Sequence, residues 1–365
     1  MRTFTTALAF ALAAPLFAAE LGTQNNLVAH EWGTFTSVAG ADGDPVRWST
    51  LSGPADLPCF VAHGPELKSA FEGLVRMETP VLYFYSKLPM KLSVDVNFLT
   101  GTITEWYPRA NDSGGSRLHW DSVELTPGQN PQFPMSHGAS RYFAARNTDA
   151  APLDIGGERE KMIFYRGVGS FAIPLRPKFT ADGKVEVRNI SQDRIPLAIL
   201  FENRGGKLGY RIEPDFQESA TLDPPESNGN IDGIRSAIYN ALVERGLYPK
   251  EAQAMLDTWQ DSWFEEGMRL IYVLPQRPVD AVLPLSIQPA PAELTRAFVG
   301  RIELLSPSTK QDLLTAASAG AVDGLKKYGR FLSAFAGQIK GLSSSAAYRQ
   351  AAEVADDPKF GRCIQ

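Results

Sequence analysis

The run His30-Glu31-Trp32-Gly33-Thr34-Phe35-Thr36 places a candidate metal ligand and a carboxylate beside an indole and an alternating Thr-Phe-Thr pattern. Such alternation is typical of a β-strand, so we expect a loop that enters a strand here. A helical zinc-protease site needs a second histidine four positions after the first, and that position holds Thr34. Gly33 also disfavours a helix, so a metal bound by His30 must take its other ligands from elsewhere in the chain.

Short strands separated by turns are predicted outward from this run. Leu92–Phe98 alternates apolar and polar residues and leads through a short turn into Thr102–Tyr107, which predicts a hairpin with one buried face. A second hairpin is expected at Pro196–Ile212 around a double-glycine turn. Repeated short strands with Gly and Pro turns indicate an antiparallel β-sandwich or barrel within a β-rich domain of residues 20–214.

The composition changes at residues 215–230, a stretch rich in Pro, Asp, Ser and Asn that we interpret as a linker. Helical spacing of apolar residues follows, with Asp232 as a cap, Gly246 as a stop and Pro249 as the start of a second helix. Later extended segments predict strands at Arg269–Leu274, Leu283–Ile287 and Ala297–Leu304. We therefore expect an α+β protein in which residues 231–365 form a mainly helical region with a few strands.

Residues 1–19 have the three parts of a secretory signal peptide: a basic start at Arg2, an apolar run and small residues at Ala18 and Ala19. We expect a periplasmic or secreted mature chain that starts near Glu20. No other apolar run approaches the roughly 20 residues that a spanning helix needs, so stable membrane insertion is not expected. Acidic residues outnumber basic ones by 41 to 36, which argues against a nucleic-acid partner.

The sequence holds two cysteines, Cys59 and Cys363. In an oxidising compartment an even pair predicts one disulfide, which would tie the C-terminal tail to the N-terminal domain. One alternative makes Cys59 a thiolate ligand together with His63, because Cys-x3-His lies within zinc-type spacing. The other alternative is that both are free buried thiols.

All four histidines lie in the first 137 residues: His30, His63, His119 and His137. Imidazoles from separate loops of a β scaffold can meet around one divalent metal ion, with zinc as the default and copper or iron as alternatives. We predict such a site, with His30 and two of the other three histidines as ligands and Glu31 as the general base. The alternative for each histidine is an ordinary hydrogen-bonded or solvated residue.

These features favour an exported metal-dependent enzyme, a hydrolase or an oxidase, that acts on a small molecule or a glycan. The competing hypothesis is a non-catalytic envelope or extracellular protein that binds a glycan or a protein, since no complete catalytic motif is present. Carboxylates beside aromatic rings at Glu105-Trp106 and Trp120-Asp121 suit a sugar-binding cleft. The glycan hypothesis requires an exposed strip of four rings, those of Trp32, Trp106, Tyr107 and Trp120.

Three segments resemble an uncharacterised group of exported bacterial proteins that carry an N-terminal His-Glu-Trp-Gly-Thr-Phe-Thr motif. The segments are His30–Val38, Arg76–Tyr85 and Phe298–Arg301. The resemblance spans most of the mature chain and implies secretion. It assigns no activity, and no functional residue is carried over from it.

Overall fold

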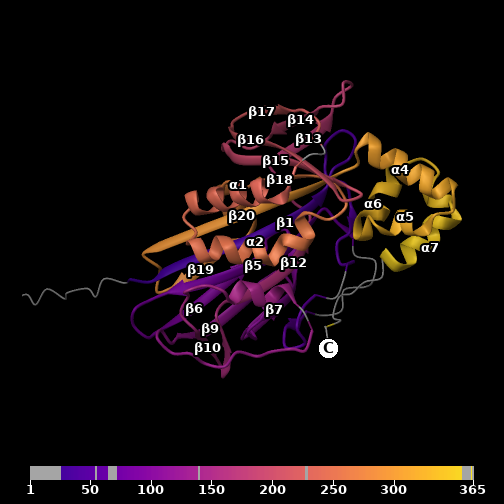
Figure 1. Cartoon of the computed structure of the whole chain (residues 1–365). Coiled ribbons are helices and arrows are strands. Elements are labelled where there is room, and N and C mark those ends of the chain that lie inside the picture. The colour runs from indigo at the N-terminus through magenta and orange to yellow at the C-terminus, as the bar shows by residue number, and fades with distance from the viewer. Residues whose placement is uncertain are drawn as a thin grey trace, which may run out of the picture.

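The computed structural model describes residues 26–53, 56–64, 72–138, 140–226, 229–355 and 363. The predicted signal peptide, residues 1–19, lies outside the described residues. Figure 1 shows a large central sheet with two helices over it, a smaller sheet below it and a group of short helices at one end. Within the described part of the chain, no helix is long and apolar enough to cross a membrane.

The described strands of the central sheet follow the order β16-β15-β18-β20-β1-β5-β12-β7-β3. Their bounds are β1 (Val28–Val38), β3 (Ala62–His63), β5 (Val75–Tyr85), β7 (Gly101–Tyr107), β12 (Ile163–Gly169), β15 (Ile195–Arg204), β16 (Lys207–Phe216), β18 (Gly267–Val273) and β20 (Glu293–Leu304). β1 runs parallel to β20 and antiparallel to β5, so the sheet is mixed and not purely antiparallel as predicted. Local patterning does not encode this pairing, because the partners Glu31 and Arg296 are 265 positions apart.

This sheet takes strands from both sides of the predicted linker. β1, β5 and β12 precede residues 215–230, whereas β18 and β20 follow them. The predicted linker itself contains a strand, β17, that belongs to a small three-stranded sheet. The strands of that sheet are β13 (Leu175–Phe179), β14 (Val185–Asn189) and β17 (Ser219–Leu222).

The run from His30 to Thr36 lies wholly within β1, so it is strand throughout and not a loop that leads into one. β1 is buried on both faces. Phe35 belongs to the core shared with the smaller sheet, and Trp32 belongs to the core beneath two helices. Gly33 is required by packing, because an added Cβ would lie 2.5 Å from the Phe298 ring.

The smaller sheet has the order β11-β10-β9-β6-β19, with β8 paired to β9. Its strands are β6 (Met90–Asn97), β8 (Asp112–Gly114), β9 (Arg117–Leu125), β10 (Leu153–Ile155), β11 (Glu158–Glu160) and β19 (Leu285–Gln288). The predicted hairpin of 92–98 with 102–107 is therefore wrong in its pairing, because β6 and β7 belong to different sheets. A Cβ on Gly101 would lie 2.3 Å from the Phe98 ring, so the chain passes between the sheets at a close contact. The second predicted hairpin is confirmed as β15 with β16.

The two helices over the central sheet are α1 (Ile231–Glu244) and α2 (Pro249–Trp263), and their apolar residues share a core with it. α2 begins at the predicted proline, and Gly246, with φ of 99°, follows α1 as predicted. The cap of α1 is Asn230, whose side chain accepts a hydrogen bond from the backbone N–H of Asp232. The predicted cap, Asp232, is thus two residues later in the chain than the observed cap, Asn230.

The C-terminal helices pack at one end of the central sheet around Glu78 of β5. This carboxylate lies 2.6 Å from Arg330 and 3.0 Å from Arg76. Burial would raise the pKa of Glu78, but the arginines outweigh that effect and hold it at about 2. The ion network therefore joins the helical end to the sheet. The remaining elements are β2 (Trp48–Ser49), β4 (Glu72–Gly73), η1 (Arg141–Arg146), α3 (Gln276–Val282), α4 (Pro307–Ser318), α5 (Val322–Lys326), η2 (Gly329–Phe331), α6 (Leu332–Gly337), η3 (Leu342–Ser344) and α7 (Ala346–Ala355).

Cys59 and Cys363 form the predicted disulfide across a sequence separation of 304. Cys59 is therefore not a thiolate ligand beside His63. Because a bridge across so long a loop restricts the unfolded chain, we expect a Cys59→Ser/Cys363→Ser variant to lose up to about 5 kcal/mol of unfolding free energy. Urea unfolding of the variant and of the oxidised wild type measures this loss. Equal stability of the two proteins would contradict the expectation.

Candidate functional site

β1 separates the two residues that were predicted to work together. Successive side chains of a strand point to opposite faces, and His30 faces α2 while Glu31 faces Tyr165 on the other side. Both side chains are fully buried. His30 and Glu31 therefore do not face a common site.

Glu31 is held by two donors on its own side of the sheet. Arg296 donates from Nε to Glu31 Oε2 at 2.6 Å, and the Tyr165 hydroxyl donates to Oε1. Burial opposes the charge of Arg296, but Glu31 outweighs it and raises the arginine pKa. This arrangement is a buried ion pair that links β1, β12 and β20, and it leaves Glu31 poorly placed to take a proton from water.

If Glu31 is such a structural ion-pair partner, its substitution lowers stability. Glu31→Gln leaves the buried Arg296 guanidinium with Asp280 as its one ionic partner in the described part of the chain, and we expect a loss of about 3 kcal/mol in unfolding free energy. Urea unfolding measures it. The control is Glu124→Gln on β9, whose side chain is 57% exposed and for which we expect a change within about 0.5 kcal/mol. Similar values for both variants would refute the structural role.

His30 forms a buried pair with Glu251 of α2. Its Nδ1 lies 2.7 Å from Glu251 Oε2, and neither side chain is exposed. Glu251 is the third residue of α2, and the same oxygen accepts the backbone N–H of Tyr248 in a capping box. Its other oxygen accepts the hydroxyl of Tyr85 at 2.8 Å. The helix cap thus places a carboxylate against the imidazole.

The second nitrogen of His30 is the unusual atom of this cluster. Nε2 is buried and has no hydrogen-bond partner among the described residues. The nearest carboxylate is that of Glu293, 3.9 Å away, whose side chain is 58% exposed. The ring of Tyr248 lies beside the imidazole at 4.4 Å between centroids. We call His30, Glu251, Tyr85, Tyr248 and Glu293 the His30 cluster.

The structure does not bring the other predicted ligands to His30. His63 lies on β3 at the edge of the central sheet, four strand spacings or about 19 Å from β1. His119 belongs to the smaller sheet, and His137 is exposed in a loop. Among the described residues no three His, Cys, Asp or Glu side chains group as a metal would require. Metal binding at His30 remains a prediction.

His119 forms an ion triad at the surface of the smaller sheet. Its Nδ1 lies 2.9 Å from Asp95 and its Nε2 lies 2.5 Å from Asp121. Burial lowers the pKa of His119, but the hydrogen bonds and charges of Asp121 and Asp95 outweigh that effect and raise it above the usual value. The triad joins β6 to β9, so its role is explained by sheet packing.

A raised folded-state pKa gives a defined pH dependence of stability. The contribution of His119 is fully present below the unfolded-state pKa of about 6.5 and is lost as pH rises through the higher folded-state pKa. We therefore expect His119→Gln to lower the urea midpoint at about pH 5.5 more than at about pH 9. A pH-independent difference between variant and wild type would contradict this assignment.

The four rings predicted as a glycan-stacking strip are buried. Trp32 and Trp120 have no exposed surface, and Trp106 and Tyr107 are 7% and 3% exposed. Packing in the two cores accounts for all four rings. The prediction of an aromatic glycan platform built on them is therefore wrong.

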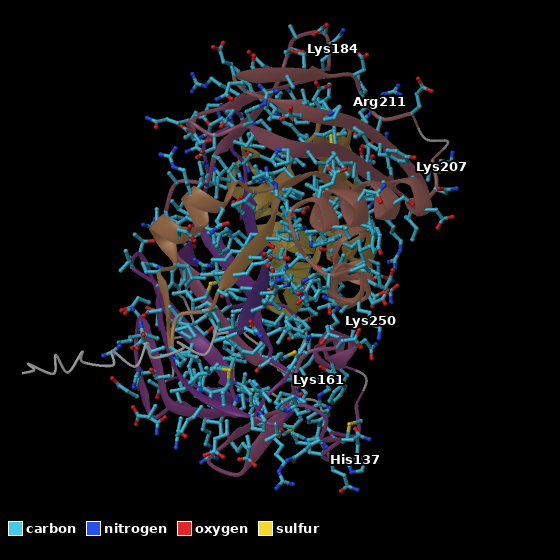
Figure 2. The ribbon with its side chains drawn as sticks, turned by 90° about the vertical axis from the view of Figure 1, so that its left-hand side faces the viewer. His137, Lys161, Lys184, Lys207, Arg211 and Lys250 are labelled. Atoms are coloured by element: carbon cyan, nitrogen blue, oxygen red, sulfur yellow. A yellow bond between two sulfur atoms is a disulfide. The ribbon has the colours of Figure 1, made fainter. Side chains whose placement is uncertain are left out.

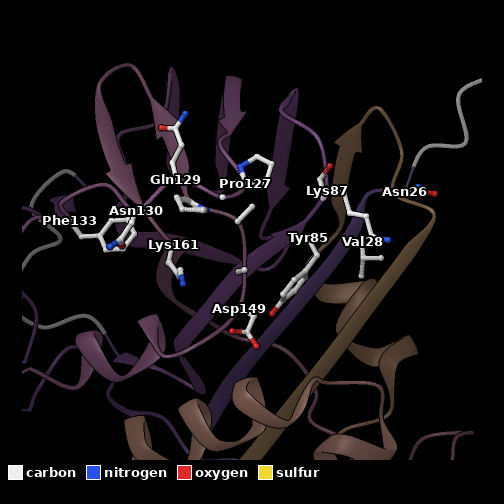
Figure 3. A pocket seen from close by; sticks show the side chains of 15 residues that line it. Asn26, Val28, Tyr85, Lys87, Pro127, Gln129, Asn130, Phe133, Asp149 and Lys161 are labelled. Carbon is white, nitrogen blue, oxygen red and sulfur yellow. The ribbon is translucent and has the colours of Figure 1, made fainter.

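A cavity of about 740 Å³ opens beside the His30 cluster (Figure 3). Tyr85 forms part of its wall, as do Val28 and Lys161. Val28 of β1 pairs with Glu293 of β20. The Glu293 carboxylate, which lies near His30 Nε2, therefore belongs to the strand next to this wall. The loop at 127–133 closes the opposite side (Figure 3).

Arg146, at the end of η1, fixes that loop. Its guanidinium lies within 6 Å of the centroids of four aromatic rings, those of Phe60, Phe133, Tyr142 and Phe143. It also donates to Glu160 at 2.6 Å and to the carbonyl of Pro134 at 2.8 Å. Phe133 belongs to the cavity wall, so the stack around Arg146 holds the wall in place.

His30 was identified from the sequence, whereas Glu251, Tyr85 and Lys161 were not. The start of α2 at Pro249 was predicted, and a glutamate two residues later is the usual position of a capping box, so Glu251 had a detectable local signal. No local sequence signal indicates its contact with His30, which lies 221 positions earlier. Comparison with protein-family models and with curated proteins finds no match for the chain. The resemblance to exported bacterial proteins stays a prediction.

Proposed function

We propose that the protein is an exported enzyme in which His30 is the general base and Glu251 orients it. The observation that carries this proposal is the buried Nε2 of His30, which has no hydrogen-bond partner while Nδ1 is held at 2.7 Å by Glu251. A base oriented by a carboxylate is the recurring arrangement of acid–base and nucleophilic catalysis.

The hydrogen-bond pattern supports a defined tautomer. Glu251 accepts hydrogen bonds from Tyr85 and Tyr248, and a carboxylate offers only acceptors to a third partner. Nδ1 of His30 therefore carries the hydrogen, and whenever the ring is neutral its lone pair is on Nε2. A buried polar atom without a partner costs about 1–3 kcal/mol, and contact with a substrate would remove that cost.

Access to Nε2 is supported by the two partly exposed side chains beside it. Tyr248 is 40% exposed, and Glu293 is 58% exposed. Rotation of either side chain would open the imidazole to a molecule bound along the cavity wall at Val28. A purely structural pin between β1 and α2 would use Nδ1 in the same way and would need no such rotation.

A metal-dependent version uses the same atom. Nε2 is the nitrogen that would bind a divalent ion, zinc by default, and Glu293 is the second ligand within reach. Catalytic zinc has three protein ligands as a rule, and the described residues supply no third one here. A general base needs only the histidine and its carboxylate, so we rank that role first.

The alternative function is a non-catalytic binding protein of the cell envelope or exterior. The 740 Å³ cavity favours it, because the cavity has the size of a small-molecule site and does not require His30. In that case the His30 cluster serves only to attach α2 to the sheet.

Chemical modification and turnover together test the proposed base. Diethyl pyrocarbonate acylates accessible imidazole nitrogens, and we expect peptide mapping of the native protein to find His30 modified, faster in Tyr248→Ala. We also expect the wild type to consume a component of a small-metabolite mixture, and His30→Gln to lose this activity while Asp323→Asn, a fully exposed remote control, keeps it.

Thermal unfolding checks that the His30→Gln variant is folded. Elemental analysis of the variant and of the wild type reports any bound metal. An unreactive His30 in the native state, or consumption that survives His30→Gln, overturns the proposal. Absence of any consumption by the wild type favours the binding-protein alternative.

A further inference from the structure

We propose that the cavity beside β5 binds a small carboxylate-bearing molecule, and that Lys161 holds its carboxylate. In Figure 3 the side chain of Lys161 extends into the hollow between the loop at 127–133 and Tyr85. The inference names the ligand class of the cavity. It rests on the cavity itself and does not require His30 to be a base.

The charges on the cavity wall are its first support. Lys87 and Lys161 line it, and the one acidic lining residue, Asp149, is paired with Lys250 at 2.6 Å. The whole chain carries a formal net charge of −5. A local excess of positive charge on an acidic protein is not expected from composition, and it would attract an anion.

The hydrogen bonds of Lys161 are the second support. Its Nζ donates to the carbonyl of Thr148 at 2.8 Å, and this is the one acceptor that the described residues give it. An ammonium group has three hydrogens, so two remain for a ligand. Burial lowers the pKa of Lys161 and outweighs the opposing charges of Asp149 and Glu160, so a bound carboxylate would add to the compensation that these two residues give.

The rest of the lining fits a short polar molecule. The amides of Gln129 and Asn130 can donate to the second oxygen of a carboxylate or to a hydroxyl group. Phe133 and Tyr85 add apolar surface for a carbon skeleton. The volume of 740 Å³ falls within the usual range for small-molecule sites, about 300–1,000 Å³.

A purely structural reading makes Lys161 a clamp for the segment at Thr148. Such a clamp would be indifferent to added anions, whereas a ligand-binding lysine would be protected by them. The two readings therefore differ in a measurement that does not depend on knowing the natural ligand.

The test uses succinate as the anionic probe and succinamide as its uncharged analogue. Lysines of the full-length protein are acetylated with a succinimidyl ester, and the rate at each lysine is followed by peptide mass mapping. At a succinate concentration about ten times its Kd we expect Lys161 to react about tenfold more slowly. Lys184, which pairs with Asp223 on the remote three-stranded sheet, is the internal control and should keep its rate. Figure 2 shows Lys161 and Lys184 far apart on the molecule.

Calorimetry with variants separates the possible outcomes. We expect succinate binding to be lost in Lys161→Met, weakened in Lys87→Met and unchanged in Lys184→Met, with succinamide silent throughout. His30→Gln should bind succinate like the wild type, so a failed catalytic proposal leaves this one standing. Equal protection of Lys161 and Lys184, equal binding of succinamide, or no heat and no protection in the wild type overturns the inference.

Discussion

The parallel pairing of β1 with β20 is the contact on which the rest of the structure depends. It closes the centre of the nine-stranded sheet between strands from the two ends of the chain. The same register brings Glu31 opposite Arg296, and their side chains form a buried ion pair there. It also sets Glu293 beside the edge of His30. Core packing on one face and the candidate site on the other therefore follow from a single non-local pairing.

The adjacent residues His30 and Glu31 show how a strand places neighbouring side chains in different chemical surroundings. Glu31 meets an arginine and a tyrosine, and its hydrogen-bonding capacity is used for folding. His30 binds the Glu251 carboxylate through Nδ1, and its Nε2 has no hydrogen-bond partner among the described residues. Both side chains are fully buried, and they differ in how many of their hydrogen-bonding atoms have partners among the described residues.

Much of the local structure was predictable, because alternation and helix caps depend on neighbouring residues. The hairpin of β15 with β16 and the start of α2 at Pro249 were predicted on those grounds. Strand partners were not, since a period of two reports which face is buried and not which strand lies alongside. The pairing of β6 was wrong for this reason. Prediction of the site was limited in the same way. His30 could be identified from the sequence, but its contact with Glu251 joins residues 221 positions apart.

The arginine stacked among four rings has a consequence for how molecules would enter the cavity. A guanidinium stays charged at every accessible pH, and Arg146 is held by Glu160 as well as by the rings. The wall at Phe133 is accordingly preorganised. If the cavity binds a ligand as proposed, association with such a wall would avoid the entropy of ordering a loop, and diffusion and orientation would set its rate instead of a closing step.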